Sequence, residues 1–167
     1  MCVALAALDA VVHVQGSNGA RDIAFADFHR LPGEHPELDS TLQPDELIVH
    51  IDLPDAQRFV AHSAYLKIRE RLSYAFALAS VAAALELADD GSIRAVRVAL
   101  GGVAHKPWRL PEAEARVVGM PATPHTFAQL ADALLQGAQS QGENAFKIPL
   151  AHRTIVRALD VAREGTI

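Results

Sequence analysis

The sequence predicts an α+β chain in which antiparallel sheets pack against helices. Short strand-like runs separated by Gly, Asn and Asp turns occupy the first two thirds, and amphipathic helical patterns occupy the last third. Of the 167 residues, 50% are hydrophobic, which is sufficient for one packed domain or two small ones. The pattern breaks at residues 54–61, which begin with Pro54, and we therefore predict two subdomains, residues 1–57 and 60–165.

The first eight residues read as the middle of a buried helix. They contain no capping residue and no charged side chain. We expect this stretch to be covered in a larger parent protein, with Met1 an internal methionine. A surface of this kind, left open, is expected to make the chain self-associate.

A hairpin is predicted next. Residues 9–15 alternate as a strand does, residues 16–19 form a turn with an Asn18-Gly19 step, and residues 21–25 return as the partner strand. A loop rich in proline and glycine follows at residues 31–41.

Residues 46–53 are predicted to form a further strand that ends at Pro54. Its odd positions are all apolar, whereas the even positions are Ile48, His50 and Asp52. Ile48 is therefore expected to be the one apolar side chain on a polar face.

The second subdomain begins with a strand-like run at residues 63–71. Residues 75–87 are rich in alanine, and helix propensity alone would make them helical. However, residues 89–91, Asp-Asp-Gly, form a hairpin-type turn before a strand at residues 93–100. Such a turn needs a strand on both sides, so we predict that the second half of 75–87 is a strand.

Two helices are predicted near the C-terminus. Thr123 caps the first, Pro124 opens it, and a core-facing stripe runs from Phe127 to Leu135. Pro149 is predicted to open the second helix and Gly165 to end it. Its core face consists of Ile155, Ala158, Leu159 and Ala162.

Composition excludes several classes of function. The net charge is −5 and the fifteen Lys and Arg residues are scattered, so we expect no nucleic acid partner. The longest apolar run is too short for a membrane span, which needs about 20 apolar residues. The single cysteine, Cys2, excludes an internal disulfide, and a reducing compartment is expected.

The familiar catalytic motifs are missing, and we predict neither catalytic residues nor a metal site. The sequence contains no glycine-rich phosphate motif, no nucleophile elbow and no zinc-binding helix motif. None of the eight histidines is spaced three or four residues from another, so we expect them to be surface residues.

Two segments allow a functional reading beside a structural one. Residues 63–77 place three basic residues and two tyrosines between apolar neighbours, which suits an anionic aromatic ligand or an ordinary strand edge. Residues 101–109 carry the only tryptophan, Trp108, beside Lys106 and Arg109. This tryptophan suits either a partner-facing anchor or a side chain packed over the end of a hairpin.

Five segments carry a resemblance to a known family. They are T-L-Q-P-D-E-L-I-V-H-I-D-L-P (41–54), S-A-Y-L-K-I-R-E-R (63–71), S-V-A-A-A-L-E-L (80–87), I-R-A-V-R-V-A-L-G-G-V-A-H-K-P-W-R (93–109) and A-E-A (113–115). In this order the chain resembles the FAD-binding subunit of molybdenum hydroxylases, the xanthine dehydrogenase family, and is most similar to the FAD subunits of bacterial aldehyde oxidoreductases. The match covers nearly the whole chain.

The resemblance implies a role in electron relay. In this family the subunit carries FAD, and partner chains carry molybdopterin and iron–sulfur clusters. Residues 1–57 resemble the C-terminal portion of the FAD-binding subdomain of the PCMH type, and residues 60–165 the CO dehydrogenase flavoprotein C-terminal domain. The implied partners are the molybdopterin-binding large subunit and the iron–sulfur small subunit, and we also allow for a homo-oligomer. The cytoplasm is the implied compartment, or the periplasm where a partner carries the export signal.

Two residues are carried over from the family to this chain. Ile48 matches the aliphatic residue whose strand approaches the flavin, and Lys67 matches a lysine that contacts it. Residues 68–76 correspond to the loop on the acceptor side of the flavin. This loop lacks the paired acidic residues of the animal xanthine dehydrogenases, so the resemblance does not extend to NAD as acceptor.

The glycine-rich segments that hold the flavin pyrophosphate in this family are absent from these 167 residues. We therefore expect the isolated chain to bind FAD weakly or not at all. The alternative function is a non-catalytic docking module for the molybdenum and iron–sulfur subunits, and an unrelated soluble binding domain is a weaker third reading. Flavin absorbance in the purified chain separates the first two readings.

Overall fold

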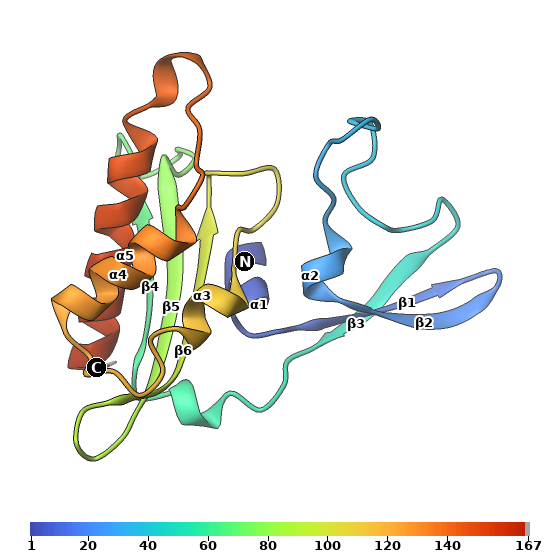
Figure 1. Ribbon diagram of the computed structural model, residues 1–167. Coiled ribbons are helices and arrows are strands. Elements are labelled where there is room, and N and C mark those ends of the chain that lie inside the picture. The colour runs from blue at the N-terminus through green and yellow to red at the C-terminus, as the bar shows by residue number, and fades with distance from the viewer. Residues whose placement is uncertain (166–167) are drawn as a thin grey trace.

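The computed structural model describes residues 1–165 and shows an α+β fold. These residues contain two three-stranded antiparallel sheets, of order β2-β1-β3 and β4-β5-β6, and five α-helices. Figure 1 shows the sheets side by side, with α1 (Cys2–Ala7) against the second sheet on the side of the first, and α4 (Pro124–Leu134) and α5 (Lys147–Glu164) on its outer face. The predicted fold class is confirmed.

The first sheet contains the predicted hairpin. Strands β1 (Val11–Gly16) and β2 (Gly19–Ala24) pair around a tight turn, in which Gly19 has a φ of 109° that favours glycine. Phe25, which we assigned to the return strand, instead begins the short helix α2 (Phe25–Phe28). Its ring is buried with Ala10, Val12, Val14 and Ile23 in a small core of this sheet.

Strand β3 (Leu47–Asp52) does not follow the predicted alternation. A β-bulge shifts its pairing with β1, so that His50 lies opposite His13 but Ile48 lies opposite Val14. Cross-strand partners share a face of the sheet. Ile48 and His50 therefore lie on opposite faces, and the prediction that they share one face is wrong. All six residues of β3 are exposed, and the strand lies at the edge of the sheet.

The second sheet is formed by β4 (Ser63–Ile68), β5 (Ala79–Leu87) and β6 (Ile93–Gly101). The alanine-rich segment is a strand, as the turn at residues 89–91 predicted. Seven of the nine residues of β5 are buried, and the strand pairs on both edges. Small side chains fit a strand covered on both faces, and this packing outweighs the helix propensity of alanine.

Helices α4 (Pro124–Leu134) and α5 (Lys147–Glu164) cover one face of the second sheet. The Thr123 side chain accepts a hydrogen bond from the backbone N–H of Thr126, which confirms the predicted cap. Helix α5 begins two residues before Pro149, because the first turn of a helix tolerates a residue without an N–H. It ends at Gly165 as predicted, and its four predicted core residues are buried.

Besides α2, three short elements were not predicted from the sequence. They are helix α3 (Pro111–Ala115) and the single turns η1 (Gln57–Phe59) and η2 (Gly142–Asn144). Among residues 1–165, no helix is both long enough and apolar enough to cross a membrane.

Helix α1 (Cys2–Ala7) explains the apolar N-terminal sequence. Val3 and Ala7 pack against Ala82 and Ala99 of the second sheet, whereas Leu5 and neighbouring residues pack against the core of the first sheet. A helix that is apolar on all sides is one that is covered on several sides. The two sheets of this chain cover much of the surface that we expected to remain exposed.

The close approach of α1 to the second sheet depends on Gly101. A Cβ atom at this position would lie 2.5 Å from Val3 Cγ2 and 2.7 Å from Ser80 Oγ. Both distances are too short for a side chain to fit without movement. Glycine at the end of β6 therefore determines how deeply α1 sits.

We predict that Gly101→Ala lowers the free energy of unfolding by about 1–3 kcal/mol, the usual range for overpacking. At a site with room, the same change would stabilise the chain by restricting the unfolded state. Urea unfolding followed by circular dichroism measures the effect. Val3→Ala removes the clashing methyl, so the double variant should lose less than the sum of the single losses. Strict additivity would contradict the proposed contact.

Candidate functional site

The face of β4 that points toward the α1 side of the sheet carries the predicted site residue Lys67. Alternation along β4 places Tyr65 and Lys67 on this face, whereas Ala64 and Leu66 pack into the main core on the other. Both Tyr65 and Lys67 are exposed. The Tyr65 hydroxyl donates a hydrogen bond to Ser80 Oγ at 3.3 Å, which holds the ring against β5.

An apolar groove of about 360 Å³ runs between α1 and the beginning of β4. It is lined mainly by small residues, with Phe59 and Tyr65 as its aromatic members. Shallow apolar walls with a polar group at the margin are typical of sites for flat ring systems. The groove therefore has a chemistry that suits an aromatic ligand.

The loop after β4 exposes large apolar side chains in its second part, residues 72–76. Leu72, Tyr74 and Phe76 are 93%, 99% and 97% exposed. Tyr74 has a φ of 57°, a left-handed conformation that is uncommon for an aromatic residue. Of the two readings of residues 63–77, this exposed apolar surface favours the site for an aromatic ligand over an ordinary solvated strand edge.

Ile48 lies on the other sheet, in β3, and its side chain is about half exposed. Lys67 and Ile48 thus come from different sheets, joined in the chain by residues 53–62. A ligand that touched both side chains would bridge the two sheets.

Trp108 packs over the end of the hairpin formed by β5 and β6. Its indole N–H donates to the carbonyl oxygen of Leu134 at 3.0 Å, and its backbone pairs with Leu100. Of the two readings of this segment, the structure supports the packing role for the tryptophan. The neighbouring basic residues reach across to the first half of the chain, where Lys106 Nζ donates to the carbonyl oxygen of Ala26 at 3.1 Å.

Arg109 is the centre of a buried ion-pair network. Its guanidinium donates two hydrogen bonds to Glu114, at 2.7 and 2.9 Å, one to Asp9 and one to the carbonyl oxygen of Ala6 at 2.8 Å. Burial is the largest single influence and lowers the pKa of Arg109. The hydrogen bonds that Arg109 donates to Glu114 and Asp9 together outweigh it, so the pKa is raised above its usual value. Glu114 also accepts from the backbone N–H of Val98.

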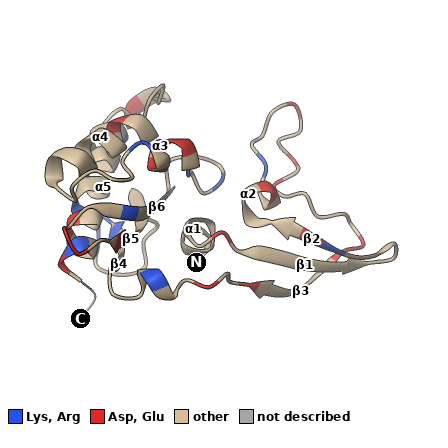
Figure 2. Cartoon of the chain, turned by 60° about the horizontal axis from the view of Figure 1, so that its bottom comes forward, with Lys and Arg blue, Asp and Glu red and all other residues tan. Residues whose placement is uncertain are grey.

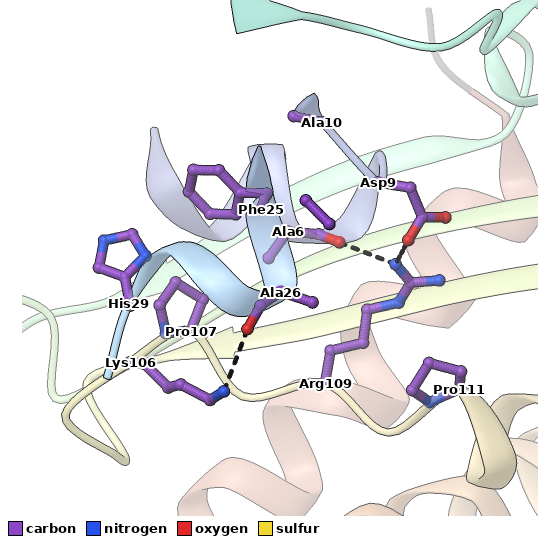
Figure 3. A pocket seen from close by; sticks show the side chains of 11 residues that line it. Ala6, Asp9, Ala10, Phe25, Ala26, His29, Lys106, Pro107, Arg109 and Pro111 are labelled. Carbon is purple, nitrogen blue, oxygen red and sulfur yellow. Dashed lines mark hydrogen bonds and ion pairs between the residues drawn. The ribbon is translucent and has the colours of Figure 1, made fainter. Parts of the chain in front are cut away.

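A small pocket of about 140 Å³ lies beside this network, between α2 and the segment before α3 (Figure 3). Lys106 and Arg109 line it together with His29. Burial, followed by repulsion from Lys106, lowers the pKa of His29, and its Nδ1 atom is buried without a hydrogen-bond partner. The pocket is too small for a dinucleotide.

A cluster of polar residues on the first sheet was missed by the sequence analysis. His13 and His50 are cross-strand partners with stacked rings, and Asp52 lies beside them. These histidines are far apart in sequence, so spacing rules for helices could not detect the pair. Only the pairing of β1 with β3 could have found it.

Lys and Arg are dispersed over the elements and mixed with Asp and Glu (Figure 2). This arrangement agrees with the absence of a basic stripe in the sequence.

Two protein families match the chain. The CO dehydrogenase flavoprotein C-terminal domain matches residues 63–162, and the FAD binding domain in molybdopterin dehydrogenase matches residues 1–56.

Two curated proteins are similar in sequence. The aldehyde oxidoreductase FAD-binding subunit PaoB of Escherichia coli K12 is 44% identical over 164 residues, which cover 98% of this chain and 48% of that protein. The glyceraldehyde dehydrogenase medium chain of Sulfolobus acidocaldarius is 29% identical over 153 residues, with coverage of 92% and 48%. The chain thus spans about half the length of these relatives.

Solved structures show the same fold. Quinoline 2-oxidoreductase from Pseudomonas putida 86 aligns with a TM-score of 0.79 and 25% identity, covering 98% of this chain and 55% of the other. Reconstituted CO dehydrogenase from Oligotropha carboxidovorans aligns with a TM-score of 0.83 and 21% identity, covering 99% and 57%.

We predict that Arg109→Met lowers the free energy of unfolding by about 3–5 kcal/mol, because it leaves the buried Glu114 carboxylate without its main partner. Arg97 Nη1 remains 3.5 Å from Glu114 and should keep the loss near the lower end. Chemical denaturation measures it.

Arg109→Met combined with Glu114→Gln removes the buried charge and should recover part of the loss, since the amide oxygen still accepts from Val98. Arg153→Met, on the exposed face of α5, is the matched control. If Arg109→Met were no more destabilising than Arg153→Met, the network would not hold the fold.

Proposed function

Because this chain belongs to the family of FAD-binding subunits of molybdenum hydroxylases, we propose that it forms part of such a subunit and serves electron relay through FAD. In this proposal electrons pass from iron–sulfur clusters to an acceptor, as in xanthine and aldehyde dehydrogenases. The observation that carries it is the match of both halves of the chain to consecutive domains of the family. The 44% identity to an aldehyde oxidoreductase subunit supports the oxidoreductase class.

The exposed residues of the chain fit a flavin. Lys67 offers a positive charge, and Tyr65 and the adjacent groove offer an apolar aromatic surface. Ile48 offers an exposed aliphatic side chain from the other sheet. FAD supplies the redox chemistry when it is bound, and the protein supplies binding, orientation and charge.

Lys67 would tune the reduction potential without forming a covalent bond. Reduction adds negative charge to the ring system, and a nearby ammonium group stabilises that charge by Coulomb attraction. The exposure of Lys67 weakens the attraction through solvent screening. The proposed role of Ile48 is different, because an aliphatic side chain contributes to retention of the ring rather than to its potential.

The proposed partners are a molybdopterin-binding large subunit and an iron–sulfur small subunit. Exposed apolar side chains on β3 and in the loop of residues 69–78 support such contacts. The proposed units are residues 1–57 and 60–165.

The same exposed surfaces favour a second candidate function. A chain with an apolar edge strand could serve as a docking module for the other subunits without contacting the flavin. The two functions differ in the role of Lys67, since a docking module needs no charge beside the cofactor.

We predict that the 167-residue chain alone binds FAD weakly or not at all. Backbone N–H cradles provide much of the affinity for a pyrophosphate, and these residues contain no glycine-rich phosphate motif. Titration followed by flavin fluorescence measures the affinity. A yellow preparation with one FAD per chain would contradict the prediction.

In the complete subunit assembled with its partners, Lys67→Ala should lower the flavin potential. A loss of about 1.4 kcal/mol corresponds to about 30 mV for a two-electron couple. Lys147→Ala, on α5, is the matched control. Ile48→Asp should instead weaken FAD retention, because it places a carboxylate against the apolar ring.

Turnover at the molybdenum site with an artificial acceptor that bypasses the flavin should survive both changes. An unchanged potential and FAD content in Lys67→Ala would contradict the flavin assignment of Lys67 and favour the docking module. Loss of the bypass activity would contradict the assignment as well.

A further inference from the structure

The first sheet gathers three polar side chains around His13. His13 on β1 lies directly opposite Asp22 on β2 and directly opposite His50 on β3. Asp52 follows two residues after His50. The rings of His13 and His50 stack with their centroids 4.0 Å apart and an angle of 11° between their planes. Three strands thus bring two imidazoles and two carboxylates to one place.

Asp22 determines the orientation of the His13 ring. The Nδ1 atom of His13 lies 2.6 Å from Asp22 Oδ1, and a carboxylate can only accept, so Nδ1 carries the proton of this bond. The Nε2 atom faces Asp52 Oδ2 at 3.1 Å and, by the same argument, donates a hydrogen bond to it in the metal-free chain. A metal ion would displace this proton, as ligand binding to a metal requires. A histidine held by a carboxylate at one nitrogen, with the other directed outward, is the usual arrangement of a metal-ligating histidine.

His50 directs a second nitrogen to the same point. Its Nε2 atom lies 3.9 Å from Asp52 Oδ1, which is too long for a hydrogen bond. His13, His50 and Asp52 can each offer one metal-ligand atom, and these three atoms lie within 4.8 Å of one another. An ordinary ion pair between His13 and Asp52 does not require this second imidazole.

We propose that His13, His50 and Asp52 bind a divalent transition-metal ion, with Asp22 as the positioning residue of His13. Zinc bonds of about 2.1 Å in a tetrahedral site separate ligand atoms by roughly 3.4 Å. The two imidazole rings, now stacked, must therefore rotate out of their parallel arrangement to direct both nitrogens at one ion. Two imidazoles and one carboxylate favour Zn²⁺, Cu²⁺ or Ni²⁺ over Mg²⁺, which prefers oxygen ligands.

The surface position of the cluster allows a metal to enter. The side chain of His13 is 21% exposed, whereas those of His50 and Asp52 are 55% and 65% exposed. Solvent can therefore fill the remaining coordination position. Because the ligands come from β1 and β3, the bound ion would fasten the edge strand β3 to the sheet. The proposed flavin contact Ile48 is on the same strand but faces the other side of the sheet, because the β-bulge pairs it with Val14. The zinc test does not depend on flavin binding.

The tag-free, EDTA-treated 167-residue chain is titrated with ZnCl₂ by isothermal calorimetry, and its melting temperature is followed with ZnCl₂ and with MgCl₂. We expect saturable binding of one Zn²⁺ per chain and a rise in melting temperature with Zn²⁺ only, since a ligand of the folded state stabilises it. His50→Gln should abolish the saturable binding. His35→Gln removes an exposed histidine that also pairs with a carboxylate, and should leave it unchanged.

Asp22→Asn tests the positioning role and should weaken Zn²⁺ affinity by about 10–100-fold without abolishing binding. If His50→Gln fails to fold, nuclear magnetic resonance of the wild-type histidine rings replaces it. Zn²⁺ should then shift the nitrogen signals of His13 and His50 and not those of the other six. No saturable Zn²⁺ binding, or binding that persists in folded His50→Gln, would overturn the proposal and leave an ion-pair cluster only.

Discussion

The arrangement of the two sheets depends on the ion-pair network around the buried guanidinium of Arg109. A charge of this kind stays in the interior only when its partners are close, and Glu114, Asp9 and the carbonyl oxygen of Ala6 supply them. Glu114 comes from α3. Ala6 comes from α1 and Asp9 from the turn that leads into β1, and Figure 3 shows both beside Arg109. The Arg109 side chain thus holds the end of α1 in place on the second sheet. It also holds Asp9, and with it the start of β1, in a fixed position relative to that sheet.

Small residues make the same junction compact. Ala82 and Ala99 receive Val3 and Ala7, and Gly101 leaves no room for a side chain. With α1 seated this closely on β5 and β6, the neighbouring strand β4 keeps a face on which Tyr65 and Lys67 are exposed. The groove beside α1 follows from the same packing. The geometry that stabilises the fold therefore also determines which surface remains for a ligand.

The exposed features of the chain are unevenly distributed. The outer face of the second sheet is closed by α4 and α5, whereas β3 and the loop after β4 expose large apolar side chains. Such surfaces are typical of a chain that functions in contact with a cofactor or with other subunits. The proposed metal ion would act on one of these elements, the edge strand β3, whose pairing with β1 it would reinforce.

The sequence by itself determined the hairpins, the two long helices, the α+β class and the family. These features rest on local signals, such as the Asn18-Gly19 turn, the Thr123 cap and the turn at residues 89–91 that identified β5 as a strand. The tertiary structure alone decided the β-bulge that moves Ile48 out of line with His50, the meeting of His13 with His50, and the Arg109 network. Each of these depends on contacts between residues distant in sequence, such as that of Arg109 with Asp9. Linear spacing carries no information on such contacts or on the register between distant strands.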